Sequence, residues 1–166
     1  ERRLWLIVLK AQQKAGLLID GQPISDEAIA DYERVIRRIN LSRIREIESR
    51  TRHDVKARIE AFNELAGHQL IHMGMTSRDA TDNTEQHLLR ESLLLIRERV
   101  VGTIELLSRR ALEYSSLPVA GRTHNVPAQM LTLGKRFSNA LEELLIGFGA
   151  LEHLISTYPL RGIKGA

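Results

Sequence analysis

The sequence predicts an all-α protein, and three observations favour this class. Hydrophobic residues make up 43% of the chain but aromatic residues only 4%, so a core of Leu, Ile, Val and Ala is expected. Apolar residues recur at three- and four-residue spacings through most of the chain, which is the helical period. The four prolines lie between or at the ends of these segments, and no alternating strand pattern of useful length separates them.

Two helices are expected in the first forty residues. The first covers residues 1–17, with Gly16 as its stop signal. Its apolar face consists of Leu4, Val8, Ala11 and Ala15. Ser25 is placed to cap the second helix. The stripe of this second helix consists of Ile29, Tyr32, Ile36 and Ile39.

Two further short helices follow in the sequence. A third helix is expected over residues 43–49. In a fourth, Val55, Ile59, Phe62 and Ala66 fall on one stripe. The next residue, Gly67, suits the position after a helix end, where a left-handed backbone is common.

Two much longer helices are predicted after residue 75. Residues 76–79 have the form of a capping box that opens a helix to about Tyr114, on the order of 55 Å long. The last helix is expected to start near Pro127 and to end before Pro159. The seam of the first long helix reads Leu89, Leu93, Ile96, Val100, Thr103 and Leu107. The seam of the second reads Phe137, Leu141, Leu144, Phe148, Leu151 and Ile155.

Two long helices with such seams favour near-parallel packing, but they cannot bury all their apolar surface against each other. Seven leucines fall outside both seams: Leu88, Leu94, Leu95, Leu106, Leu131, Leu145 and Leu154. We therefore expect a bundle that is completed by further chain, by other subunits, or by both. The predicted organisation is a small N-terminal helical domain over residues 1–75 and the first part of a central helical-bundle domain over residues 76–166.

Composition excludes several classes of protein. No cysteine occurs, so disulfides and thiolate metal sites are impossible, and the chain fits a reducing cytoplasm. A net charge of +3, without aromatics interleaved among the arginines, does not favour nucleic-acid binding. The most apolar N-terminal run, residues 4–9, is too short to span a bilayer and is not followed by a signal-peptide cleavage pattern.

Residues of catalytic type gather in three segments, each at or beside a helix start. These segments are residues 51–54, residues 72–79 and residues 121–129. Helix N-termini offer unpaired N–H donors and suit anions, and histidine works as an acid or base near neutral pH. Together the segments supply three histidines, three arginines and several hydroxyls, a set that one anionic substrate could use: His53, His72, His124, Arg52, Arg78, Arg122, Thr76, Ser77 and Thr123.

Each segment also has a structural interpretation. Thr76 and Ser77 would serve equally as helix caps, and residues 51–54 as a solvated helix start. His124, in a loop bounded by Gly and Pro, would also serve to satisfy backbone groups. Three other histidines have no suggestive neighbours and are interpreted as structural or solvated: His68, His87 and His153.

Metal and nucleophilic chemistry have no motif in the sequence. The chain contains no His-Glu-x-x-His spacing, no Gly-x-Ser-x-Gly elbow and no Gly-rich phosphate loop. Acid–base catalysis without a metal is the catalytic option that remains.

Four segments carry a resemblance to a known family. They are Thr-Arg-His-Asp-Val at 51–55, Met-Thr-Ser-Arg-Asp at 75–79, Gly-Arg-Thr-His-Asn-Val-Pro-Ala-Gln at 121–129, and Leu-Arg-Gly-Ile-Lys-Gly-Ala at 160–166. In this order and spacing the chain resembles the fumarase/aspartase superfamily, and within it the adenylosuccinate lyase family. The Thr-Arg-His-Asp segment distinguishes this family from the argininosuccinate lyases.

The resemblance implies a role for each matching residue. His124 matches the general acid that protonates the departing nitrogen, and Thr123 beside it contacts substrate. Thr76 and Ser77 match residues that hold a substrate carboxylate. The three residues Arg52, His53 and Asp54 match a segment that binds substrate near its nucleotide portion, and His72 matches a histidine close to the site whose role, chemical or structural, stays open.

The implied activity is elimination of fumarate from adenylosuccinate, giving AMP, and from SAICAR, giving AICAR, in cytoplasmic purine biosynthesis. Loss of a proton beside a carboxylate builds negative charge that fixed donors stabilise, and the leaving amine needs a proton. The family needs neither a metal nor an organic cofactor. It is homotetrameric, with active sites shared between subunits, and no nucleic-acid or membrane partner is implied.

Parts of the family's site have no counterpart in the sequence. The general base is a serine on a later Gly/Ser-rich loop, followed by substrate-binding Lys and Asn residues, and an Arg-Tyr pair lies before the point where this chain starts. We expect the chain to be a fragment that is inactive alone. An argininosuccinate lyase-like enzyme and a catalytically silent helical assembly protein are the alternatives.

Overall fold

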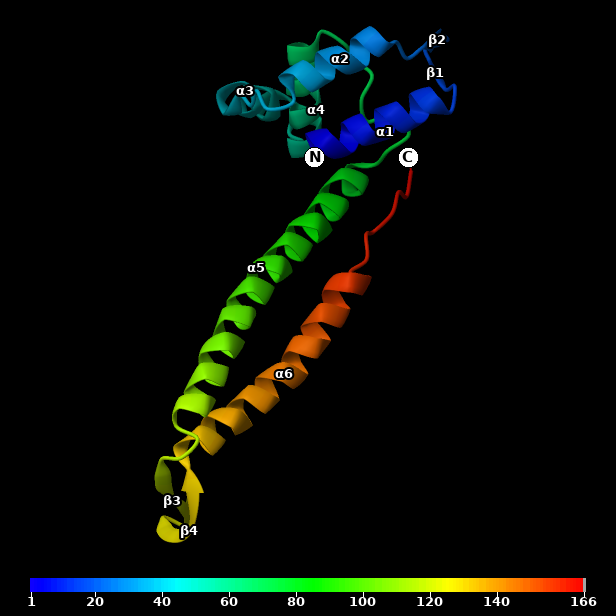
Figure 1. Ribbon diagram of the computed structural model, residues 1–166. Helices are drawn as coiled ribbons and strands as arrows, with labels where there is room; N and C mark the ends of the chain where they lie inside the picture. Colours follow the sequence, from blue (N-terminus) through cyan, green and yellow to red (C-terminus); the bar gives the residue numbers. More distant parts are fainter. Residues whose placement is uncertain (166) are drawn as a thin grey trace. The chain divides into compact units, whose positions relative to one another are not determined.

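The computed structural model describes residues 1–165, in which six helices and two small hairpins form two compact units (Figure 1). The first unit contains residues 1–86 and 160–165, and the second contains residues 87–159. The elements are α1 (Arg2–Lys14), β1 (Leu18–Ile19), β2 (Gln22–Pro23), α2 (Asp26–Val35), α3 (Leu41–Thr51), α4 (Asp54–Ala66), α5 (Ser77–Glu113), β3 (Pro118–Thr123), β4 (Val126–Thr132) and α6 (Leu133–Thr157). Helix α5 begins in the first unit and continues into the second. The predicted all-α class is thus confirmed, with the hairpins as additions.

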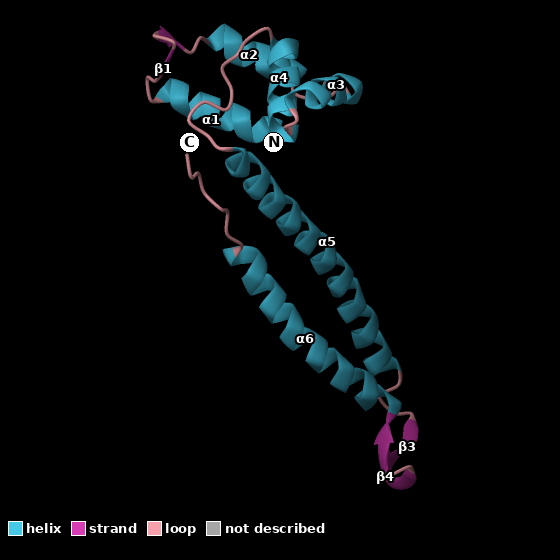
Figure 2. Ribbon diagram, turned by 180° about the vertical axis from the view of Figure 1, so that it is seen from behind, coloured by secondary structure: helices cyan, strands magenta, loops and turns pink. Residues whose placement is uncertain are grey.

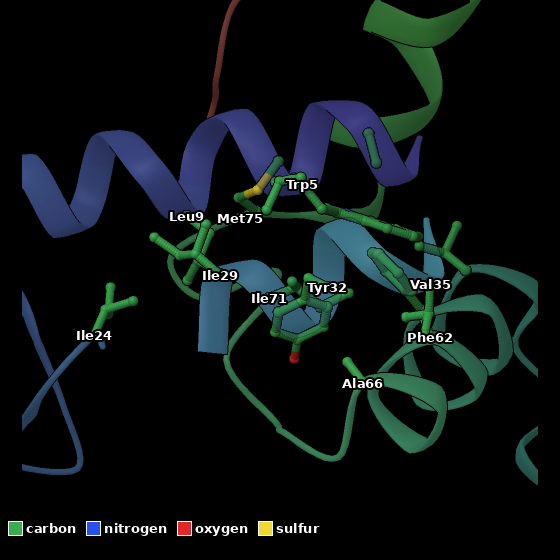
Figure 3. Close-up of a cluster of buried hydrophobic side chains, with 13 residues drawn as sticks. Trp5, Leu9, Ile24, Ile29, Tyr32, Val35, Phe62, Ala66, Ile71 and Met75 are labelled. Carbon is green, nitrogen blue, oxygen red and sulfur yellow. The ribbon is translucent and has the colours of Figure 1, made fainter. Parts of the chain in front are cut away.

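The core of the first unit lies between α1, α2 and α4 (Figure 3). Trp5 and Leu9 of α1 are buried together with Tyr32 of α2 and Phe62 of α4. The rings of Tyr32 and Phe62 meet edge to face, with centroids 5.0 Å apart. Burying side chains of this size stabilises the fold by about 1.5–3 kcal/mol each, so this cluster is the main source of stability of the unit.

Capping residues set the ends of the short helices as the sequence predicts. The Ser25 hydroxyl accepts the Ala28 N–H at 3.1 Å at the start of α2. Asn40 caps α3 in the same way, and Gly67 ends α4 with φ +78°, a backbone that a glycine adopts without strain. Helix α3 is longer than predicted at both ends.

Two predicted stripes in this unit are wrong in part. In α1 the buried residues are Trp5, Leu6 and Leu9, while Ala11 and Ala15 are exposed. The face is rotated because Trp5 is the largest apolar side chain in the helix and fills the core. Ile39 is also exposed, because α2 ends at Val35 and the stripe is not continued.

Residues 160–165, here called the strap, are bound to the start of α5 by a buried carboxylate. Asp79 is fully buried, and its Oδ1 accepts the Lys164 N–H at 2.7 Å. Its Oδ2 accepts the Gly165 N–H at 3.2 Å and the Thr76 N–H at 2.9 Å. One carboxylate thus satisfies the first turn of α5 and fixes the strap beside it, which is half of the predicted capping box.

One turn further along α5, Asn83 strengthens the same attachment. Its amide nitrogen donates to the carbonyl of Gly162 at 2.7 Å and to that of Asp79 at 2.8 Å. Its amide oxygen accepts the Arg161 N–H at 2.9 Å. The strap is therefore tied by hydrogen bonds to two successive turns of the helix.

In the second unit, α5 and α6 run alongside each other, and β3 and β4 form the hairpin that connects them at one end (Figure 2). The rings of Tyr114 and Phe137 stack with centroids 6.0 Å apart, and Arg97 of α5 pairs with Glu152 of α6. Near the hairpin the backbones approach so closely that a Cβ on Gly134 would lie 2.4 Å from the carbonyl oxygen of Ala111. Glycine is therefore required at this crossing.

The predicted start of the last helix, at Pro127, is wrong. Pro127 lies in β4 opposite Arg122, and α6 begins at Leu133 with the Thr132 hydroxyl accepting the Lys135 N–H at 3.1 Å. The expectation that no strand occurs is wrong for the same segment. The strands are mostly exposed on both faces, so they leave no apolar alternation in the sequence.

The predicted seam of α6 is confirmed, whereas that of α5 is wrong in part. All six seam residues of α6 are buried or half-buried. In α5, Leu89, Ile96 and Thr103 are exposed, and the half-buried side chains facing inward include Arg97 and Ile104. The inward face of α5 is decided by the ion pair of Arg97 and by the ring of Tyr114. A pattern of apolar residues alone does not detect such contacts.

Much of the apolar surface of the second unit is uncovered, as the sequence predicts. Five of the seven leucines outside the predicted seams are exposed: Leu88, Leu95, Leu106, Leu145 and Leu154. The other two, Leu94 and Leu131, are half-buried. The boundary predicted between residues 75 and 76 stays a prediction. Among residues 1–165, no helix has the length and hydropathy needed to cross a membrane.

Candidate active site

The turn between α3 and α4 carries three of the predicted site residues. Arg52 ends α3 with φ +55°, and its N–H donates to the Glu48 carbonyl at 2.8 Å. His53 caps α4, because its Nδ1 accepts the Lys56 N–H at 3.2 Å. Asp54 follows in the first turn, paired with Arg58 at 2.6 Å. The strained left-handed residue thus allows one helix to end and the next to begin with a histidine at its N-terminus.

His53 is in contact with the start of α5. Its Nε2 lies 3.3 Å from the Ser77 hydroxyl oxygen; His53 is exposed and Ser77 is half-buried. Because Nδ1 accepts a backbone N–H, the neutral ring carries its proton on Nε2 and donates it to Ser77. The Ser77 hydroxyl proton is then free to be donated to an acceptor from outside the protein.

Thr76 and Ser77 are held in place by the buried carboxylate of Asp79. Burial alone would raise the pKa of Asp79, but the backbone N–H groups of Lys164, Thr76 and Gly165 outweigh it and lower the pKa. Asp79 is therefore ionised at neutral pH and keeps the first turn of α5 in one conformation. The segment predicted to hold a carboxylate is built on a rigid support.

His72 lies in the loop before α5, with a left-handed backbone at φ +70°. Its Nδ1 accepts the indole N–H of Trp5 at 3.1 Å, and the two rings are perpendicular. Burial lowers the pKa of His72, the nearby charge of Asp79 raises it, and His53 lowers it, with a net lowering. The ring is neutral at neutral pH.

Thr123 and His124 lie at the tip of the β3–β4 hairpin in the second unit. His124 and Asn125 form a two-residue turn, both with positive φ, between the paired residues Thr123 and Val126. That combination matches a type I′ turn, whose twist suits a hairpin. The Thr123 hydroxyl and the Nδ1 of His124 are 3.0 Å apart, and both residues are exposed. The imidazole Nε2 is therefore presented to the surroundings at the end of a rigid hairpin.

The predicted site residues therefore fall into two sets, one in each unit. The first set brings together a histidine, a hydroxyl and a second histidine at the start of α5: His53, Ser77 and His72. The second set is Thr123 with His124. An open hollow of about 400 Å³ on α3 includes Arg52 but none of the others. In the part of the chain that the structure describes, no group of three or more His, Asp or Glu residues is arranged to hold a metal ion.

This arrangement supplies neutral donors and an acid–base group. The Ser77 hydroxyl, which accepts from His53, and the N–H groups at the start of α5 are suited to a carboxylate. His124 is suited to proton transfer.

Comparison with known proteins decides the family. The sequence profile of the family described as Lyase matches residues 1–166. This chain belongs to the lyase family. Lyases similar to it in sequence include the adenylosuccinate lyase of Saccharomyces cerevisiae, 35% identical over 99% of this chain and 34% of the yeast protein. The adenylosuccinate lyases of Streptococcus mutans and Helicobacter pylori are 30% and 31% identical, over 99% and 96% of this chain and 38% and 35% of theirs.

Two solved structures share the fold of this chain. A fumarate lyase from Mesorhizobium sp. BNC1 superposes with a TM-score of 0.78 at 23% identity, covering 92% of this chain and 36% of that one. The 3-carboxy-cis,cis-muconate lactonizing enzyme of Pseudomonas putida gives 0.75 at 23% identity, covering 92% and 35%. The chain thus spans about a third of the length of the proteins it matches.

Sequence reasoning missed the positioning roles of two residues that support the site. Trp5 and Asp79 are buried, and each holds a predicted site residue through a hydrogen bond. Asp79 was detectable as the acidic member of the capping box. For Trp5 the one signal was that the sole tryptophan of the chain lies on an otherwise aliphatic helix.

Proposed function

We propose that the complete protein containing this chain eliminates fumarate from adenylosuccinate, giving AMP, and from SAICAR, giving AICAR, in cytoplasmic purine biosynthesis. The observation that carries the proposal is the match to adenylosuccinate lyases along 99% of the chain. The geometry of both sets of site residues supports it, because the reaction needs carboxylate donors and a proton donor.

The chemistry gives each residue a task. Removing the proton beside a substrate carboxylate moves charge onto that carboxylate, which Thr76 and Ser77 would stabilise as hydrogen-bond donors. Breaking the C–N bond leaves electrons on the departing nitrogen, and His124 would protonate that atom. Arg52, His53 and Asp54 are proposed to bind nearer the nucleotide.

The family resemblance implies further site residues that have no counterpart among these 166 residues. The general base and the Lys and Asn residues that bind substrate belong to later parts of the family's sequence. We therefore propose that the 166 residues alone do not turn over substrate. A homotetramer with shared active sites is also proposed, and it is supported by the exposed leucines of the second unit.

The test is fumarate release, followed by absorbance, from the complete protein given adenylosuccinate and argininosuccinate separately. The matched variants are His124→Ala and His153→Ala, the latter replacing an exposed histidine outside both sets. We expect release from adenylosuccinate only, a loss of at least 100-fold in kcat for His124→Ala, consistent with the contribution of one general acid, and no change for His153→Ala.

Other outcomes contradict the proposal in different ways. Release from argininosuccinate would keep the mechanism but change the substrate. If the folded protein released no fumarate from either substrate, a helical assembly protein without catalysis would be favoured.

A further inference from the structure

Trp5 is buried in the core, yet its one polar atom reaches a predicted site residue. Only 1% of Trp5 is exposed, and its indole N–H donates to Nδ1 of His72 at 3.1 Å. The rings stand at 90° with centroids 6.0 Å apart, so the indole edge points at the imidazole. An indole nitrogen donates but never accepts, so this contact requires an unprotonated Nδ1.

The contact fixes which nitrogen of His72 carries the proton. A neutral imidazole has one donor and one acceptor, so acceptance at Nδ1 places the hydrogen on Nε2. Within residues 1–165, Nε2 of His72 has no hydrogen-bond partner in the protein, and it is not among the buried atoms left without one, which are Arg2 Nη2 and Arg58 Nε. One N–H therefore remains available to a ligand.

The backbone also holds this ring in an imposed position. His72 has φ +70°, a left-handed conformation that costs a residue with a Cβ of order 1 kcal/mol or more. The loop is fixed on α1 at a second point, where the Gln12 amide donates to the Met73 carbonyl at 2.9 Å. Two side chains of α1 thus place the loop, and one of them sets the proton of His72.

We propose that Trp5 is a positioning residue, which holds His72 as the Nε2–H tautomer so that His72 donates a hydrogen bond to a carboxylate oxygen of the substrate. The donor role rests on the proposed function, in which the substrate is a dicarboxylate. In this role His72 binds and orients an anion and does not remove a proton. The charged groups that act on the ring are Asp79 on α5, which raises its pKa, and His53 at the cap of α4, which lowers it, while the hydrogen bond at Nδ1 comes from Trp5.

The first measurement reads the tautomer without any reaction. The complete protein is labelled with ¹⁵N-histidine, and the signals of His72 are assigned from their loss in His72→Ala. We expect an unprotonated Nδ1 and a protonated Nε2 in the wild-type protein, and a mixture of tautomers in Trp5→Phe. Phe62→Leu is the control, because it disturbs the same core without changing the Trp5–His72 contact. This variant should leave the tautomer of His72 unchanged.

The second measurement is a double-mutant cycle on fumarate release from adenylosuccinate. Trp5→Phe should lower kcat/KM about tenfold, the effect of one hydrogen bond. In a His72→Ala background the same change should have no further effect, because Trp5 acts through His72. A merely structural tryptophan would give equal losses in both backgrounds, and that additivity would overturn the proposal.

The two readouts separate the proposal from the proposed function. A protonated Nδ1, or a tautomer unaffected by Trp5→Phe, would overturn the role of Trp5 whether or not fumarate is formed. A different result would separate the two claims: the predicted tautomer is observed and is lost in Trp5→Phe, but the protein releases no fumarate. That result would refute the proposed function and still support the positioning of His72 by Trp5.

Discussion

Replacing Asp79 by Asn tests whether one buried carboxylate holds both the start of α5 and the strap. The carboxylate accepts three backbone N–H bonds, from Thr76, Lys164 and Gly165. An amide of the same shape loses the charge and turns one acceptor into a donor that faces N–H groups. Hydrogen bonds to charged groups are worth about 1.5–3 kcal/mol each. With one bond lost and the others weakened, we expect the strap to open more easily by roughly 3 kcal/mol.

Hydrogen exchange measured by mass spectrometry on the complete protein reports this opening directly. A difference of about 3 kcal/mol corresponds to about 100-fold faster exchange of the strap and of residues 76–79. The comparison is Asp82→Asn, which removes ion pairs with Lys164 of the strap and with Arg78. Because such pairs near the surface are worth at most about 1 kcal/mol, exchange should rise by less than about fivefold. Equal exchange in Asp79→Asn and the wild-type protein would refute the reasoning.

The same carboxylate predicts a pH dependence. Its pKa in the folded protein lies below the ordinary 3.8, because the N–H donors outweigh the effect of burial. A lowered folded pKa gives stability that is complete above the unfolded value and is lost as pH falls through the folded value. The difference in strap opening between wild-type and Asp79→Asn protein should therefore shrink below about pH 4. A difference that grows on acidification would contradict this sign.

Two other changes test the packing by thermal unfolding. Gly134→Ala should destabilise the protein by about 2 kcal/mol, because the added Cβ would lie 2.4 Å from the Ala111 carbonyl oxygen and the backbone would have to shift. This cost outweighs the gain in helix propensity of about 1 kcal/mol. An unchanged or raised Tm would contradict the close approach. Tyr32→Phe should cost about 1–3 kcal/mol, because it leaves the half-buried N–H of Leu70 without its acceptor at 3.0 Å; an unchanged Tm would contradict this hydrogen bond.

The short and long helices were predictable because their signals are local. Ser25 and Gly67 mark ends through their own side chain or backbone, and α6 shows its inner stripe without interruption. The faces of α1 and α5 were harder, since tertiary contacts decide them. Trp5 rotates the buried face of α1, and Arg97 lies inside the face of α5 because it pairs with Glu152.

The hairpin was missed because its signal competes with a helix signal. Pro127 suits the first turn of a helix as well as an exposed strand, and the turn residues His124 and Asn125 lack the glycine that marks most type I′ turns. The positive φ of His124 belongs to the hairpin as a whole, in which the Arg122 side chain donates to the Asn125 carbonyl at 3.1 Å.

The candidate site was predictable as a set of residues but not as a geometry. Motif spacing selects His53 and Ser77, and only the fold shows that they lie 3.3 Å apart. The supports behind them, Trp5 and Asp79, act from the core, where sequence alone does not separate packing from positioning.

The most direct test of elimination is the product balance of the complete protein with adenylosuccinate. The account predicts one fumarate for each AMP formed and no aspartate, because the C–N bond breaks as a C=C bond forms in the departing dicarboxylate. Aspartate with IMP, in place of fumarate with AMP, would show hydrolysis and contradict the account.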